Sequence, residues 1–110
     1  MTFLRPFDPG LNETIAIANG VASAGGPLPE EANVVVLRNT SATATAYFVC
    51  TPGGATVVEA VIPVPGTLGS IGIPPGGQPI RLTVPPGPKV YRRISTAADG
   101  NLEITPGRGN

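Results

Sequence analysis

Proline and glycine recur along the whole chain in short groups, and this feature most restricts what the chain can fold into. The 110 residues include 15 glycines and 14 prolines, with groups at 52–54, 74–77 and 85–88 between apolar runs. Proline breaks helices because it lacks the backbone N–H and clashes with the preceding turn. Leu, Ile, Val and Phe still make up about a quarter of the chain, more than disordered chains contain. The pattern therefore predicts short strands separated by turns.

The segments between the breaks have the composition and alternation of β-strands. Val, Ile and Thr are enriched there, and apolar and polar residues alternate most clearly over residues 80–84. The alternation over residues 58–62 is interrupted at Val61, which is apolar at a position where a polar residue is expected. We expect strands over residues 14–18, 33–38, 43–50, 58–62, 68–73, 80–84, 89–95 and 102–105. Eight short strands at this spacing predict an all-β fold, a small antiparallel β-sandwich of the jelly-roll or Ig-like kind.

Local signals refine this prediction. Residues 34–37 are apolar on both faces, which indicates a central strand or one covered by a partner. Asp99-Gly100 predicts a hairpin between residues 93–95 and 102–105, because both turn residues tolerate positive φ. Residues 20–32, rich in Gly, Ala and Pro, are expected to form a loop. Residues 1–11 are expected to form an extended N-terminal arm, and residues 12–110 a single sandwich domain.

The residue types needed for most catalysis are missing. The chain has no histidine, which is the commonest general base and metal ligand. Cys50 has no base to activate it, so we expect a small buried hydrophobe at the end of a strand. Carboxylate spacing for a calcium loop and a phosphate-binding glycine loop are also missing. We expect no enzyme activity, no cofactor and no metal.

Charge and apolar patterning restrict the partners. Seven basic and seven acidic side chains cancel, which is unlike a protein held on nucleic acid. No apolar run approaches the length of a membrane span, and the N-terminal residues lack the pattern of a secretory signal. We expect synthesis in a cytoplasm and binding to neither nucleic acid nor membrane.

Two groups of residues are candidates for contact with a protein partner. Phe3, Leu4 and Phe7 give the arm apolar anchors, which pack either on the chain's own core or on a neighbouring subunit. Arg92 and Arg93 form the one local concentration of charge, and arginine is enriched in interfaces. The alternative for this pair is a solvated strand edge protected by charge.

The alternative function for such a sandwich is that of a cell-surface or carbohydrate-binding module. The two tyrosines, Tyr47 and Tyr91, are the candidates for stacking on a sugar ring. Both are more simply explained as sheet residues whose hydroxyl reaches water.

The last third of the chain resembles the small virion proteins of tailed bacteriophages, including capsid decoration (cement) proteins. The likeness lies in a strand led by Pro and Gly (residues 73–84), a Val-x-Arg-Ile-like strand (residues 89–95) and a last hairpin near the C-terminus. The resemblance implies a virion protein that binds the major capsid protein on the outside of a phage head, acts as a homo-oligomer (a trimer above all) and clamps neighbouring capsid subunits. These proteins share no site motif that could be matched to individual residues here.

Overall fold

The computed structural model describes residues 14–65 and 70–109, and all regular structure among them is β-strand. The strands are β1 (Ile15–Ala18), β2 (Ala24–Leu28), β3 (Val34–Asn39), β4 (Ala46–Pro52), β5 (Ile71–Ile73), β6 (Ile80–Thr83), β7 (Lys89–Ser95) and β8 (Asn101–Gly107). No described residue belongs to a helix that could cross a membrane. The all-β prediction is confirmed.

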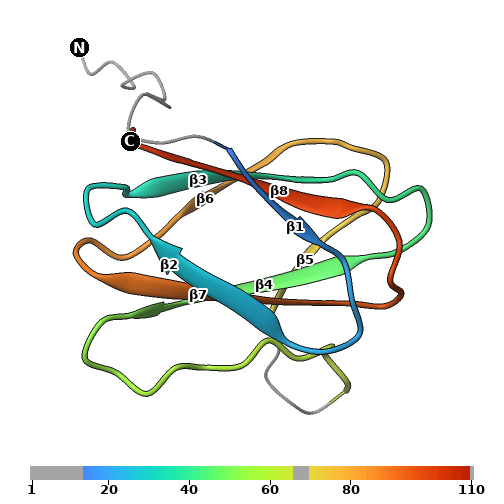
Figure 1. The fold of residues 1–110 in the computed structure, drawn as a ribbon, viewed down its shortest axis with the longest axis horizontal. Coiled ribbons are helices and arrows are strands. Elements are labelled where there is room, and N and C mark those ends of the chain that lie inside the picture. Colours follow the sequence, from blue (N-terminus) through green and yellow to red (C-terminus); the bar gives the residue numbers. More distant parts are fainter. Residues whose placement is uncertain (1–13, 66–69, 110) are drawn as a thin grey trace.

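The strands form two four-stranded sheets that pack face to face (Figure 1). Sheet 1 has the order β1-β8-β3-β6 and sheet 2 the order β2-β7-β4-β5, and every neighbouring pair is antiparallel. Pairing of the first strand with the last, and of the second with the seventh, is the strand order of a jelly roll. Of the two predicted kinds of sandwich, the chain therefore adopts the jelly roll.

The core lies between the sheets and is supplied by alternate residues of the central strands. Val35 and Leu37 of β3 and Leu102 and Ile104 of β8 are fully buried, and they face Phe48 of β4 from the other sheet. The prediction that residues 34–37 form a central strand is confirmed, since β3 lies between β8 and β6.

The strand count agrees with the prediction, but two assignments were wrong. Residues 58–62 belong to neither sheet, whereas residues 24–28, expected to be part of a loop, form β2. The sequence Ala-Gly-Gly-Pro-Leu is unfavourable for a strand, but the close approach of β7 requires small residues at this position. A Cβ on Gly25 would lie 1.8 Å from the carbonyl oxygen of Tyr91.

The expected hairpin at Asp99-Gly100 was also wrong. Gly100 has the expected positive φ of 73°. However, β7 and β8 lie in different sheets, so the turn carries the chain across the end of the sandwich. A Cβ on Gly100 would lie 2.6 Å from the backbone nitrogen of Ser41, so the approach of that loop also requires glycine.

Candidate interaction surface

The inner face of β7 carries two cations among apolar residues. Lys89, Tyr91, Arg93 and Ser95 alternate on this buried face, and the ring of Tyr91 stacks on Phe48 with the centroids 6.0 Å apart. Lys89 Nζ donates to the carbonyls of Pro29 (3.0 Å), Glu30 (3.2 Å) and Gly87 (2.6 Å). All three ammonium donors are thus engaged. Burial lowers the pKa of Lys89, while the charges of Cys50 and Glu30 act in the opposite direction.

Arg93 repeats this arrangement at the other end of β7. Its guanidinium donates to the carbonyl of Ala18, the last residue of β1, and to those of Gly20 and Ala22 in the connection from β1 in sheet 1 to β2 in sheet 2. Burial also lowers the pKa of Arg93. This arginine therefore holds the two sheets together at one end of the sandwich, and its donors point into the chain.

Arg92 points the other way, onto the outer face of sheet 2. Its Nε lies 3.4 Å from Glu59 Oε2, an ion pair without hydrogen-bond alignment. The alternative prediction, that Arg92 and Arg93 lie on a solvated strand edge, is wrong, because β7 lies between β2 and β4 in sheet 2. The charge of Arg92 holds the long connection between β4 and β5 in place.

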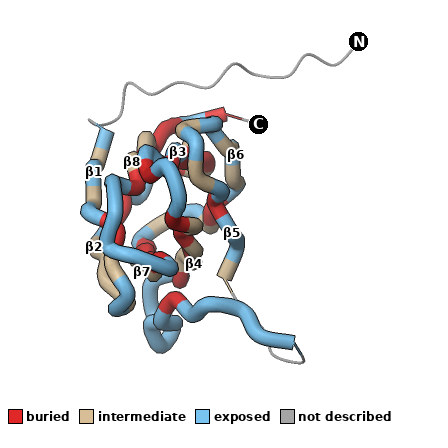
Figure 2. Tube along the Cα trace, turned by 90° about the vertical axis from the view of Figure 1, so that its right-hand side faces the viewer, coloured by how far each residue is buried: buried red, intermediate tan, exposed pale blue. Residues whose placement is uncertain are grey.

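We call residues 56–64 of that connection the strap, because they cross the outer face of sheet 2. Figure 2 shows this part of the chain beneath β7 and β4, on the side away from sheet 1. Hydroxyl side chains bind the strap: Thr51 Oγ1 accepts from Val58 N (3.0 Å), and Ser23 Oγ accepts from Ala60 N (3.0 Å). The Ser23 hydroxyl in turn donates to Glu59 at 2.6 Å. Ala60 and Thr51 are consequently buried, 2% and 3% exposed.

The outward side of the strap is apolar. We define the apolar ridge as the exposed aliphatic residues of the strap and of the adjacent edge strand β5. These residues are Val57, Val58, Val61, Ile62, Val64 and Ile71, each 37–55% exposed. Val61 N donates to Ser70 Oγ (3.2 Å), which ties the strap to the start of β5. Clusters of exposed apolar residues mark interaction sites, so the strap and β5 are the candidate here.

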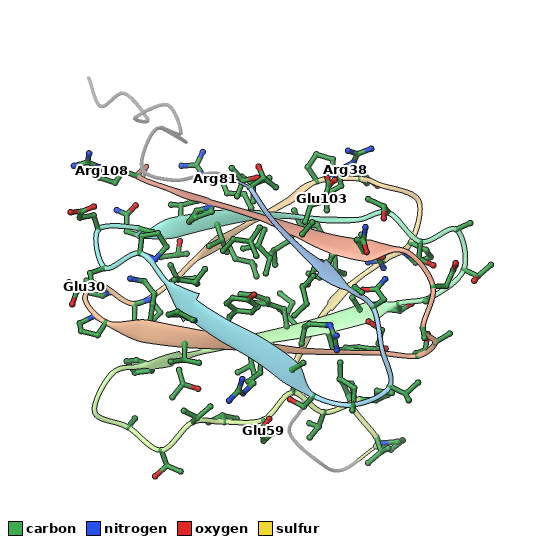
Figure 3. The ribbon with its side chains drawn as sticks, viewed as in Figure 1. Glu30, Arg38, Glu59, Arg81, Glu103 and Arg108 are labelled. Carbon is green, nitrogen blue, oxygen red and sulfur yellow. The ribbon has the colours of Figure 1, made fainter. Side chains whose placement is uncertain are left out.

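The opposite outer face, on sheet 1, is charged. Figure 3 shows Arg38, Arg81, Arg108 and Glu103 along the side of the molecule that lies farthest from Glu59. Arg38 Nη1 pairs with Glu103 Oε1 at 3.2 Å, and Arg38 Nε donates to the carbonyl of Gly77. The two outer faces therefore differ in character, one apolar and one rich in arginine.

The residues singled out by the sequence fall in different places. Phe3, Leu4 and Phe7 lie outside the described residues. Arg92 and Arg93 lie on opposite faces of sheet 2, so the sheet separates two residues that the sequence grouped together. Their contact with a partner stays a prediction, with Arg93 already bonded inside the chain.

The aromatic and cysteine residues are also separated. Tyr91 is 5% exposed and belongs to the core, whereas Tyr47 is half-buried on the outer face of β4. Cys50 is less buried than expected and packs at the margin of the core. Among residues 14–65 and 70–109, no three His, Cys, Asp or Glu side chains are grouped so as to hold a metal ion.

The strap is the candidate site that sequence reasoning missed. Its signal was the blemish in alternation, since adjacent Val61 and Ile62 would have put apolar side chains on both faces of a strand. Prolines at 63 and 65 were the second signal, because proline within a run argues against a central strand. Together these features are typical of a segment that packs on a sheet.

Comparison with known proteins adds no relative. No protein-family model, curated protein sequence or solved structure matches the chain.

Proposed function

We propose that this protein is a non-enzymatic structural protein of a tailed-phage virion, a capsid decoration protein. It binds the outside of the phage head and stabilises it by bridging subunits of the major capsid protein. The observation that carries the proposal is the apolar ridge formed by the strap and the edge strand β5. Folded alone, the chain leaves these six aliphatic side chains 37–55% exposed to water. That arrangement favours a protein made to assemble.

The polar chemistry of the chain supports the same function. Lys89 and Arg93 are bonded to backbone carbonyls, and Glu59 and Glu103 are paired with arginines. Jelly rolls are common in viral capsid proteins, and they also occur in lectins. The burial of Tyr91 removes one of the two rings on which sugar binding would depend. Assembly is therefore better supported than sugar binding.

The N-terminal arm supplies the contact with the capsid in this proposal. Phe3, Leu4 and Phe7 are large apolar anchors of the kind that dominate binding energy in interfaces. An arm of 11 residues ahead of a compact domain can reach a neighbouring capsid subunit, since 11 fully extended residues span at most about 40 Å. Arm and jelly roll together would then bridge two subunits.

Sedimentation with empty capsids tests the proposal. The purified protein is mixed with capsids assembled from the major capsid protein of the same genome, then pelleted. We expect the full chain to pellet with the capsids, and a chain lacking residues 1–9 to stay in the supernatant while its circular dichroism is unchanged. The double variant Phe3→Ala, Phe7→Ala should bind at least about tenfold more weakly. The variant Thr83→Ser, on the outer face of sheet 1, is the matched control.

Two results would overturn the proposal. One is a full chain that does not pellet with capsids at any concentration. The other is micromolar binding to a glycan that is lost in Tyr47→Ala, which would replace the capsid with a sugar as the partner.

A further inference from the structure

We propose that Asn19 is a site of spontaneous deamidation that is closed in the folded protein and open in the unfolded chain, so that modification there makes unfolding irreversible. Asparagine is chemically labile, and Asn19-Gly20 is the one Asn-Gly pair among the 110 residues. Glycine has no side chain to obstruct its backbone nitrogen, so this pair deamidates more readily than other asparagines do. Modification at this site does not depend on the proposed function.

The reaction needs only the chain and water. The backbone nitrogen of Gly20, having lost its proton to hydroxide, attacks Cγ of Asn19 and forms a C–N bond. The bond from Cγ to Nδ2 breaks, and Nδ2 leaves as ammonia with a proton from water, which returns the hydroxide. Water then opens the cyclic imide at either of its two carbonyls. The products are aspartate and its isomer, which has an additional carbon in the main chain, and both carry a new carboxylate.

The folded protein holds the side chain of Asn19 in place. Asn19 is 5% exposed, and its Nδ2 donates to Asn39 Oδ1 (2.9 Å) and to the carbonyl of Asp99 (2.8 Å). Cγ can turn toward the backbone nitrogen of Gly20, and Nδ2 can leave, only after both hydrogen bonds break. Burial also keeps hydroxide and water from the reacting atoms.

The backbone of the pair is fixed as well. Asn19 N donates to the carbonyl of Gly100 (2.9 Å), in the turn before β8. The carbonyl of Gly20 accepts from Ser95 N (2.8 Å), at the end of β7. Closing the imide ring rotates the peptide between Asn19 and Gly20, so it requires this end of the sandwich to open.

Neither product fits the place that Asn19 occupies. In aspartate an oxygen stands where Nδ2 donates, so Asn39 Oδ1 and the carbonyl of Asp99 each lose this donor. Asn39 cannot turn its own amide to compensate, because its Nδ2 donates to the carbonyls of Ala44 (2.7 Å) and Ile73 (3.1 Å). The isomer lengthens the main chain at the same point, which misplaces the turn after β1. A deamidated chain should therefore not regain the native fold.

Peptide mass spectrometry of folded and unfolded protein tests the inference. The full chain is incubated at pH 8 in buffer or in guanidinium chloride, and peptides that contain residue 19 are examined for the rise in mass when NH2 is replaced by OH. We expect Asn19 to be lost at least about a hundredfold more slowly in the folded protein, because buried segments open rarely. In denaturant, the fraction of chains that refold on dilution, measured by circular dichroism, should fall with the same time course as Asn19.

The variant Gly20→Ala is the matched control. A Cβ on Gly20 would lie 3.6 Å from its nearest neighbour, Arg93 Nη2, and Gly20 does not have a positive φ, so this variant should fold. Its methyl group hinders attack by the backbone nitrogen, so the variant should still refold after the same incubation. The pair Asp99-Gly100 can form an imide by loss of water and is the competing cause. If it were responsible, Gly20→Ala would lose refolding as fast as the native chain.

That result would overturn the inference. So would loss of Asn19 at the same rate in folded and unfolded protein, or a fully deamidated chain that refolds with the native midpoint of unfolding. Direct production of Asn19→Asp is an independent check. We expect this variant to remain unfolded or to unfold at a lower denaturant concentration, and stability equal to that of the native protein would contradict the fit described here.

Discussion

Two buried cations on the inner face of β7 are held by backbone carbonyls and not by carboxylates. Each cation, Lys89 and Arg93, engages three carbonyls, and these lie in loops that pass between the sheets, except that of Ala18 at the end of β1. The loops need donors there because their carbonyls are turned toward the interior, where an unmet acceptor is costly. The cations therefore stabilise the crossings at the two ends of one strand.

Replacing Arg93 should destabilise the protein far more than replacing its neighbour. Arg93→Met leaves three carbonyls without their donor, so we expect a loss of about 2–4 kcal/mol in the free energy of unfolding. Arg92→Met removes a partly exposed ion pair and should cost less than about 1 kcal/mol. Urea unfolding of both variants measures the difference. Equal losses at the two positions would contradict this role for Arg93.

Cys50 gives the stability a pH dependence of known sign. Burial raises the pKa of its thiol above the ordinary value of 9.0, while the charge of Lys89 lowers it to a smaller extent. The folded chain then keeps a proton that the unfolded chain loses, so this contribution is complete below pH 9.0 and decreases as the pH rises through the folded pKa.

Between pH 8 and pH 10 the midpoint of thermal unfolding should therefore fall further, or rise less, in the native protein than in Cys50→Ala, since Lys89, whose pKa burial lowers, acts in the opposite direction in both proteins. Tyr91, whose pKa burial also raises, acts in the same direction as the thiol at higher pH and is unchanged in that variant. At pH 8 the native thiol should react with a disulfide reagent more slowly than the urea-unfolded chain. Identical pH slopes for the two proteins would show that the thiol does not contribute.

Among the elements, β2 shows how packing can override composition. Its Ala-Gly-Gly-Pro-Leu sequence lacks the branched residues that favour strands. Gly25 is nevertheless needed because β7 passes so close to it. Pro27 is tolerated because β2 is an edge strand, where an N–H is not needed on the outer side.

Adjacent glycines of β2 provide a matched pair of variants. Gly25→Ala would place a methyl group against the carbonyl of Tyr91 and push β2 from β7, with an expected loss of at least about 2 kcal/mol. For Gly26→Ala the nearest atoms are those of the Tyr91 ring at 3.9 Å, so a change within about 0.5 kcal/mol is expected. Chemical unfolding of the two variants decides the point, and equal stabilities would contradict the close approach.

The elements also show how far the sequence predicts the structure. Strands with alternating residues, such as β6 and β8, were predicted because their burial depends on a period that the sequence displays. Strand β2 was missed because its formation depends on the close approach of β7, which the sequence of residues 24–28 does not display. The strap was mistaken for a strand because its valines suit a sheet, whereas its place depends on Ser23 and Arg92, which are distant in sequence.

The candidate site was predicted less well than the fold for the same reason. Arg92 and Arg93 are adjacent in sequence, and β7 sends them to opposite faces. No local pattern could identify Glu59 as the partner of Arg92. The surfaces of this protein combine residues that are distant in sequence, and a local sequence pattern cannot identify such partners.

At the scale of the whole molecule, the jelly-roll order makes every neighbouring strand pair distant in sequence. The first strand pairs with the last, and even β4 and β5 are separated by residues 53–70. Contacts of this kind require large loops to close before they stabilise anything.

Refolding should therefore be slow for a chain of this size. Stopped-flow dilution from urea, followed by tyrosine fluorescence, should give a main phase in the range of milliseconds to seconds. Refolding that is complete within microseconds would contradict the topology. The variant Arg92→Met provides a comparison in which a peripheral contact is changed and the strand order is not.

Pairing of β1 with β8 has a practical consequence. Thr14 and Thr105 are joined by a hydrogen bond of 2.8 Å between their hydroxyls, and Asn33 binds the backbone of Gly109 nearby. The beginning of β1 and the end of β8 therefore lie together beside sheet 1, away from the strap (Figure 1). A short linker could join these ends and the chain could be reopened at the exposed turn near Gly76, giving a circular permutant. A cargo fused after Gly109 would be attached at the same end of the molecule, away from the strap. The cargo would therefore not cover the exposed aliphatic residues of the strap, and the protein could serve as a display scaffold.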